Sequence, residues 1–174
     1  MAHVFISYHH TDADFAFAAQ QQLETVGLTA ELNPLPEAGT VWYPWIEAVL
    51  RDSFALVPVM SPTARAAEVV TYEWAFAIGA GFDVIPVIAA PTELHPRLAA
   101  LDPLDFSDSP VFGDSPVFGD SPRWDDLRAR VWERADMLSY EAITVPADIP
   151  NAVGDTLAAL HAHAAAERLA AVDA

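Results

Sequence analysis

Short apolar segments alternate along the chain with longer segments in which apolar residues recur every three or four positions. The short segments, rich in Val, Ile and Phe, predict strands buried on both faces. The periodic segments between them predict helices. The strands are expected at residues 3–8, 28–32, 54–60, 84–88 and 104–106, and the helices at 11–26, 42–50, 63 or 66 to 78, and 94–101. This alternation predicts an α/β fold in which helices cover both faces of a parallel sheet.

Several residues mark where the predicted helices begin and end. Thr11–Asp14 resembles a capping box, with Asp in the place of the usual Glu. Gly27 ends the first helix, and Gly79 and Gly81 end the helix that precedes the fourth strand.

Three predicted loops follow strands at one edge of the sheet, at residues 7–11, 33–40 and 61–65. Open parallel sheets bind ligands at the carboxyl ends of their strands, near the reversal of strand order. These loops are therefore expected to form the functional rim. Ser7 and Ser61 lie at strand ends, but the pattern places no His–Asp pair beside either, which disfavours a hydrolase triad.

The segment after the fifth strand carries a duplicated hexad, Ser109–Asp114 followed by Ser115–Asp120. Ser-Pro and Gly-Asp favour turns, so we interpret it as a tandem duplication within a surface loop. A docking loop presenting Phe112 and Phe118 is the alternative.

Beyond the hexad, the pattern predicts a helix over 124–138, a short strand over 142–145 and an Ala-rich helix over 153–172. The Ala-rich helix has a thin apolar stripe, which would pack on the domain or meet a partner helix.

Composition and charge narrow the function classes. The 174 residues have a net charge of −17, from 25 acidic residues against eight arginines and no lysine. Such a surface repels nucleic-acid backbones and anionic membranes. The chain has no cysteine, which excludes disulfides, Cys-ligated zinc and Cys nucleophiles and fits a cytoplasmic protein. No signal peptide or membrane span is predicted.

Glu73 is the polar residue that departs most from its surroundings, because it interrupts the apolar helical segment 69–78. A buried carboxylate is costly unless it is paired or used, and burial would raise its pKa. Glu73 is therefore expected either to pair with an arginine or to act on a ligand. His161 and His163 point away from each other on a helix, and His9–His10 lack a third ligand, so no metal site is predicted.

Several of these segments, in this order and at these spacings, resemble the Toll/interleukin-1 receptor (TIR) domain of bacterial or plant type. The resemblance covers about residues 3–138, which sets a TIR domain over 1–138 and a C-terminal helical extension over 139–174. It implies a flavodoxin-like sheet of five parallel strands in the order 2-1-3-4-5. The matching segments are Val4–Tyr8, Gly39-x-x-Trp42-x-x-x-Ile46-x-x-x-Leu50-x-x-Ser53, Leu56–Ser61, Glu73-x-x-x-Ala77 and Val84–Val87.

Many TIR domains cleave NAD+ between nicotinamide and ribose, giving ADP-ribose or a cyclic isomer. The resemblance thus implies an NAD+ nucleosidase with Glu73 as the catalytic residue, NAD+ as substrate and no cofactor or metal. In bacteria, such a protein would serve antiphage defence or cell-suicide signalling. The residues that would line the NAD+ pocket are Ser7, Tyr8, His9, His10, Asn33 and Trp42.

This sequence departs from the family pattern at three positions. Val69 stands where the family often has a ligand-stacking Trp, Asn33 where it has Asp, and His9 where it has a basic residue. A non-enzymatic assembly module, which acts by TIR–TIR stacking, is the main alternative. A flavodoxin-like nucleotide or flavin binder is a third reading of the same architecture.

The resemblance also implies that self-association, with an activating partner, gates catalysis, because a neighbour's second-strand loop completes the pocket. That loop, residues 33–41, carries Leu35 and leads into Trp42–Tyr43. Net charge opposes association of like copies, so a monomer or weak dimer is expected in dilute buffer.

Overall fold

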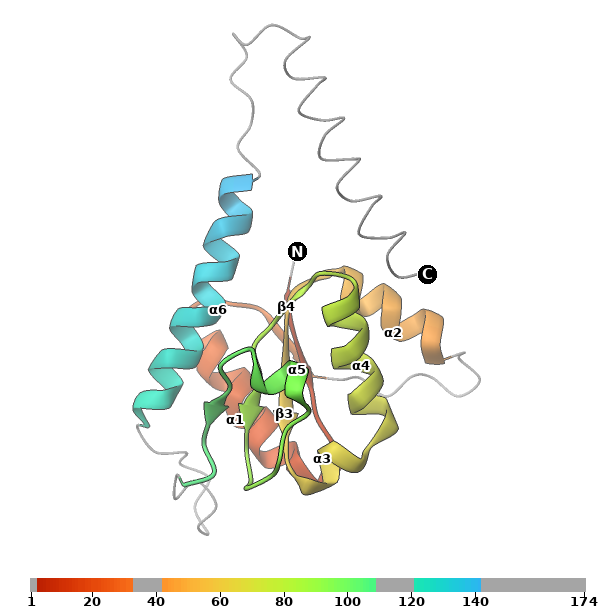
Figure 1. Cartoon of the computed structure of the whole chain (residues 1–174). Coiled ribbons are helices and arrows are strands. Elements are labelled where there is room, and N and C mark those ends of the chain that lie inside the picture. Colours follow the sequence, from red (N-terminus) through yellow and green to blue (C-terminus); the bar gives the residue numbers. More distant parts are fainter. Residues whose placement is uncertain (1–2, 33–41, 109–120, 142–174) are drawn as a thin grey trace, which may run out of the picture.

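A computed structural model describes residues 3–32, 42–108 and 121–141 (Figure 1). Residues 42–45 and 137–141 are described by their backbone alone. The predictions for the second-strand loop, for the hexad, and for the strand and helix after residue 141 lie outside the described residues.

The strands form one parallel sheet with the order β2-β1-β3-β5-β6, and β4 also pairs with β3. β1 lies inside the sheet, with β2 on one side and β3 on the other. The predicted parallel α/β fold is confirmed, and the order agrees with 2-1-3-4-5 when β4 and β5 together are taken as the fourth predicted strand and β6 as the fifth. The bounds are β1 His3–Ser7, β2 Ala30–Leu32, β3 Ser53–Met60, β4 Asp83–Val84, β5 Val87–Ile88 and β6 Leu104–Asp105.

The strand count differs from the prediction, because the single strand expected over 84–88 is two short strands. Asp83 pairs with Ala55 and Val87 with Val59, so both halves keep one register against β3. Pro86 lies between them and has no N–H to donate to the ladder. A proline thus divides one predicted strand without displacing it.

The helices connect the strands and cover both faces of the sheet. A short 3-10 helix, η1, precedes α1, and the connection between β3 and β4 holds two helices. The bounds are η1 His10–Asp12, α1 Ala13–Glu24, α2 Trp42–Arg51, α3 Pro62–Ala66, α4 Glu68–Gly79, α5 Pro96–Ala99 and α6 Pro122–Glu141.

One local prediction about the helices is wrong and another is settled. The capping box at Thr11 is not formed, because Asp12 is the N-cap of α1 and its side chain makes no capping bond. Of the two starts expected for the helix that ends near 78, the later one, Ala66, lies two residues before α4 begins at Glu68. The earlier start, Thr63, belongs to the separate helix α3, which ends before the extended residue Ala67 (φ −81°, ψ 120°). The predicted stops hold: α4 ends at Gly79, and Gly27 and Gly81 take positive φ angles of 82° and 75°.

The sheet separates two apolar cores, and Figure 1 shows the helices on its two sides. Val4 and Ile6 point into the core beneath α1 and α6. Phe5, between them, points into the core beneath α2 and α4. Alternate residues of one strand therefore serve opposite faces, as the pleat requires.

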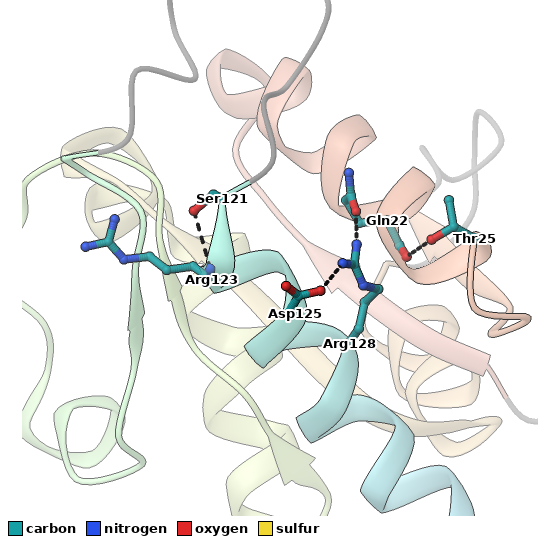
Figure 2. Close-up of polar contacts among 6 residues, drawn as sticks. All are labelled: Gln22, Thr25, Ser121, Arg123, Asp125 and Arg128. Carbon is teal, nitrogen blue, oxygen red and sulfur yellow. Dashed lines mark hydrogen bonds and ion pairs between the residues drawn. The ribbon is translucent and has the colours of Figure 1, made fainter.

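Helix α6 is held to the rest of the domain by aromatic packing and by polar contacts with α1. Trp124 is buried against Phe106 and Phe15, with ring centroids 4.4 and 5.3 Å away. Arg128 donates to Gln22 of α1 and to Asp125 of its own helix (Figure 2).

Candidate functional site

The end of β1 sends two predicted site residues to opposite faces of the sheet. Ser7 follows the alternation of Phe5 and therefore faces α2 and α4. Its Oγ is buried and has no hydrogen-bond partner among the described residues. Tyr8 is half-buried and packs against the core beneath α1 and α6. The structure thus separates the Ser7 and Tyr8 side chains that the sequence grouped in one pocket.

Glu73 lies on the same side of the sheet as Ser7. It is fully buried, on the stripe of α4 formed with Val70, Trp74 and Ala77. This i, i+3, i+4, i+7 spacing is that of a helix face turned to a core. A carboxylate therefore lies among apolar residues on the packed face of the helix.

Helix α4 runs between the two ends of the sheet. The helix follows β3 and α3 and leads to Asp83, which pairs near the start of β3. It therefore runs back from the rim toward the amino ends of the strands. Trp74 meets the ring of His95, from the segment after β5, at a centroid distance of 5.2 Å. Glu73 is the sixth of the twelve residues of α4, so it lies midway along this path.

A contact that the sequence did not indicate joins α4 to α2. Tyr72 donates a hydrogen bond of 2.8 Å to Glu47 Oε1, and Arg51 lies 3.8 Å from the same carboxylate. Tyr72 adjoins Glu73, so this bond links the helix that carries Glu73 to the helix that begins at Trp42. No local pattern pointed to it, because the partners are 25 residues apart.

The loop after β1 carries the two adjacent histidines. His9 is half-buried and His10 exposed, and their ring centroids lie 4.1 Å apart. His9 Nδ1 lies 2.8 Å from Thr11 Oγ1 and also accepts from the Thr11 backbone N–H at 3.3 Å. The His9 ring is therefore held by its own loop.

Two of the three predicted rim loops meet directly. Thr11 Oγ1 lies 2.9 Å from Thr63 Oγ1, in the segment after β3. Ser61 Oγ lies 2.9 Å from Thr63 Oγ1 and donates to Asp12 Oδ2 at 2.6 Å. The juxtaposition of 7–11 with 61–65 is confirmed. The participation of Asp12 was missed, since a lone Asp before a helix indicates only a cap.

Two predicted site residues cannot be placed in this geometry. Asn33 lies outside the described residues, and Trp42 begins α2 but its side chain is not described. Val69, at the position of the family's frequent Trp, is 41% exposed. Across the described ranges, no three His, Asp or Glu side chains gather in a way that would hold a metal ion.

A cavity of about 230 Å³ opens at the other end of the sheet, where β4 begins. Its apolar lining includes Ile78 and Phe82, and Arg130 and Arg134 of α6 reach it. Neither Ser7 nor Glu73 lines it. Within the described segments, no helix is both long and apolar enough to cross a membrane.

Comparisons with known proteins agree with this architecture. The family model described as "TIR domain" matches residues 4–115, more than half of the chain. Comparison with curated proteins gives no significant match.

Solved structures with similar folds include two from animals. The TIR domain of the Toll-related receptor TRR-2 from Hydra magnipapillata is 23% identical, with a TM-score of 0.60 over 76% of this chain and 99% of that one. A TIR-STING receptor from C. gigas is 19% identical, with a TM-score of 0.55 over 75% of this chain and 40% of that one. With the family model matching most of the sheet and the fold shared with these structures, the chain belongs to the TIR domain family.

Proposed function

We propose that this protein is an NAD+ nucleosidase that cleaves the bond between nicotinamide and ribose. The observation that carries the proposal is Glu73, a fully buried carboxylate in a TIR fold, on the same side of the sheet as the buried hydroxyl of Ser7. Sites that tune a carboxylate for chemistry combine such burial with neighbouring polar groups.

In the proposed reaction, the C1′–N bond breaks and its electron pair leaves with nicotinamide. The ribose gains oxocarbenium character, which the Glu73 carboxylate stabilises electrostatically. Water then adds at C1′ and loses a proton, giving ADP-ribose, or a hydroxyl of the same molecule adds and gives a cyclic isomer. The proposed substrate is NAD+. Because nicotinamide is a good leaving group, the step needs no metal or cofactor.

The burial of Glu73 sets a condition on this chemistry. The side chain has no exposed surface, so the substrate reaches it only after the covering groups move. In the proposal, contact with another copy or an activating partner supplies that movement. Such gating suits a cytoplasmic bacterial protein that consumes NAD+ during antiphage defence.

Nicotinamide release from NAD+ by the purified chain tests the proposal, alone and with infected-cell extract. Glu73→Gln keeps the side-chain volume and removes the charge, and it should lower kcat by about 100-fold or more. Glu68→Gln, on the exposed first turn of the same helix, is the matched control and should retain activity. Far-UV circular dichroism checks that both variants fold.

Two outcomes would contradict the proposal. Full activity in a folded Glu73→Gln variant would remove that residue from the chemistry. No nicotinamide release from the unsubstituted chain, under any of these conditions, would remove the activity.

The second candidate is an assembly module without catalysis. The exposure of Val69, where the family often carries a stacking Trp, favours it, as do the exposed side chains of Phe17 and Trp132, each 51% accessible. If the protein is such a module, infected-cell extract should induce association of its copies without release of nicotinamide from NAD+.

A further inference from the structure

The outer edge of β4 has no neighbouring strand. Ile85 donates its backbone N–H to the Leu56 carbonyl of β3 at 2.8 Å, and Asp83 pairs with Ala55 of the same strand. Because the backbone groups of successive strand residues point to opposite sides, Val84 turns its N–H and C=O away from β3. Among the described residues, no strand pairs with β4 on that side. Val84 therefore presents one backbone donor and one backbone acceptor at an open edge.

The strand that could cover this edge begins too late in the chain. β6 starts at Leu104, whose N–H donates to the Pro86 carbonyl at 2.9 Å, and it pairs with β5. The chain just before β6 is fixed by Arg130 of α6, which donates to the carbonyl oxygen and the carboxylate of Asp102 at 2.5 and 2.6 Å. The open edge of β4 is thus part of the folded architecture.

The cavity of about 230 Å³ lies at this edge. Val84 and Ile85 line it, and further apolar walls come from Ile78 and Phe82, at the end of α4, and from Leu101, before β6. Pockets for drug-sized molecules start at about 300 Å³, whereas an apolar cavity of about 150 Å³ accepts benzene. The volume therefore suits one molecule of amino-acid size and is too small for a dinucleotide.

Four charged side chains line the cavity, two of each sign. Arg130, Glu133 and Arg134 have the i, i+3, i+4 spacing of one helix face. Arg134 lies 3.4 Å from Asp83, so these two charges balance each other. Arg130 uses two of its five N–H hydrogens in its contacts with Asp102, and Glu133 is exposed. A guanidinium and a carboxylate therefore face the cavity, which is the complement of a carboxylate and an ammonium.

We propose that this cavity binds a free α-amino acid with an apolar side chain. The carboxylate of the ligand accepts from the Val84 N–H and from Arg130, and its ammonium donates to the Val84 carbonyl and to Glu133. Its side chain contacts Ile78 and Phe82. The ligand thus gives Val84 the two backbone partners that a neighbouring strand would give. This inference does not rest on the proposed NAD+ cleavage.

The probe is L-leucine, added to the full ¹⁵N-labelled chain near neutral pH while the backbone amide shifts are followed. We expect the Val84 amide to shift saturably, with a Kd of about 1 mM or below, because so small a ligand makes few contacts. Two further probes each lack one charged group of leucine. 4-Methylpentanoate lacks the ammonium and 3-methylbutylamine lacks the carboxylate, and each should bind at least about tenfold more weakly.

Glu133→Gln removes the partner of the ammonium at an exposed position and should raise the Kd for leucine about fivefold or more. Asp126→Asn is the matched control. Asp126 is exposed on α6, two turns earlier on the same face, and it does not line the cavity. The control loses the same charge and should bind leucine as tightly as the unsubstituted chain.

Three results would overturn the proposal. The first is the absence of a saturable shift at Val84 with leucine up to about 20 mM, well above the expected Kd. The second is equal affinity for leucine and for either probe that lacks a charged group. The third is an equal loss of affinity in Glu133→Gln and Asp126→Asn, which would assign the effect to overall charge. These samples contain no NAD+, so failure here leaves the proposed NAD+ cleavage unaffected.

Discussion

Asp102 has left-handed backbone geometry without being a glycine. Its φ angle is 53°, and Arg130 of α6 holds it by donating to its carbonyl oxygen at 2.5 Å and to its carboxylate at 2.6 Å. Both Asp102→Ala and Asp102→Gly lose the carboxylate, but only Ala retains the steric penalty of this region. We expect Ala to be less stable than Gly by about 1 kcal/mol, measured by urea unfolding. Equal stabilities would show that the backbone at this turn relaxes freely.

Asp105 offers a pH-dependent test at the residue scale. Hydrogen bonds from the Ser107 side chain and then its backbone hold the pKa of Asp105 below its ordinary 3.8. Burial opposes them, and the charge of Arg123 lowers the pKa by less than burial raises it. A lowered folded-state pKa means that the ionised carboxylate stabilises the fold above pH 3.8. That contribution disappears as the pH falls through the folded-state value.

Removing the first of these causes should therefore move the titration. In Ser107→Ala the pKa of Asp105 rises toward 3.8 but stays below it, because the Ser107 backbone N–H still donates, at 2.9 Å. Carboxyl ¹³C shifts across an acid titration report the change. Ser107→Thr keeps a hydroxyl and should keep the lower pKa. An identical titration in Ser107→Ala would show that the side chain plays no part.

At the scale of elements, the aromatic cluster of Phe15, Phe106 and Trp124 joins α1, the end of β6 and α6. All three side chains are buried, and the Phe106 centroid lies 5.2 Å from Phe15 and 4.4 Å from Trp124. Phe106→Ala leaves a cavity between these elements and should cost about 3–5 kcal/mol of unfolding free energy. Phe17→Ala, on the exposed face of α1, should change it by less than about 0.5 kcal/mol. Similar losses for both variants would mean that the cluster does not anchor α6.

The elements that could be predicted from the sequence are those whose signal is local. β3 lies within a residue of its expected bounds, because an apolar run ending at Ser61-Pro62 needs no distant information. The break at Ala67 had no local signal, since alanine favours a continuous helix. Pro86 was evident in the sequence, but whether a proline interrupts a strand depends on which neighbouring strand its missing N–H would have faced.

The candidate site divides in the same way. The burial of Glu73 was predictable because this charged residue interrupts an apolar helical stripe. The contacts of Thr63 with Thr11 and Ser61 were not predictable, because single Ser and Thr residues are ordinary in loops and are brought together only when β1 and β3 lie side by side. The opposite orientations of Ser7 and Tyr8 were predictable from the strand alternation, because adjacent residues of a strand point to opposite faces of the sheet.

At the scale of the whole molecule, charge and exposed apolar surface oppose each other. A net charge of −17 repels like copies, while Phe17, Trp132 and Val69 leave apolar surface exposed. The Debye length falls from about 10 Å at 0.1 M salt to about 3 Å at 1 M, so added salt should promote association. Light scattering across a sodium chloride series, with and without NAD+, measures it. A molar mass that stays constant across the series, or a tight oligomer whose mass does not depend on salt, would contradict the proposed opposition between charge repulsion and apolar attraction.

The position of β1 between β2 and β3 has a consequence for how the chain is made. β1 is synthesised before either strand that flanks it, and all five of its residues are buried in the finished sheet. Until β3 leaves the ribosome, about fifty residues later, this apolar strand has an unpaired edge. Long-range parallel pairing of this kind folds slowly and leaves nascent chains prone to aggregation. A chaperone that captures nascent chains should therefore bind this protein at β1, and should release it once β3 is available to pair.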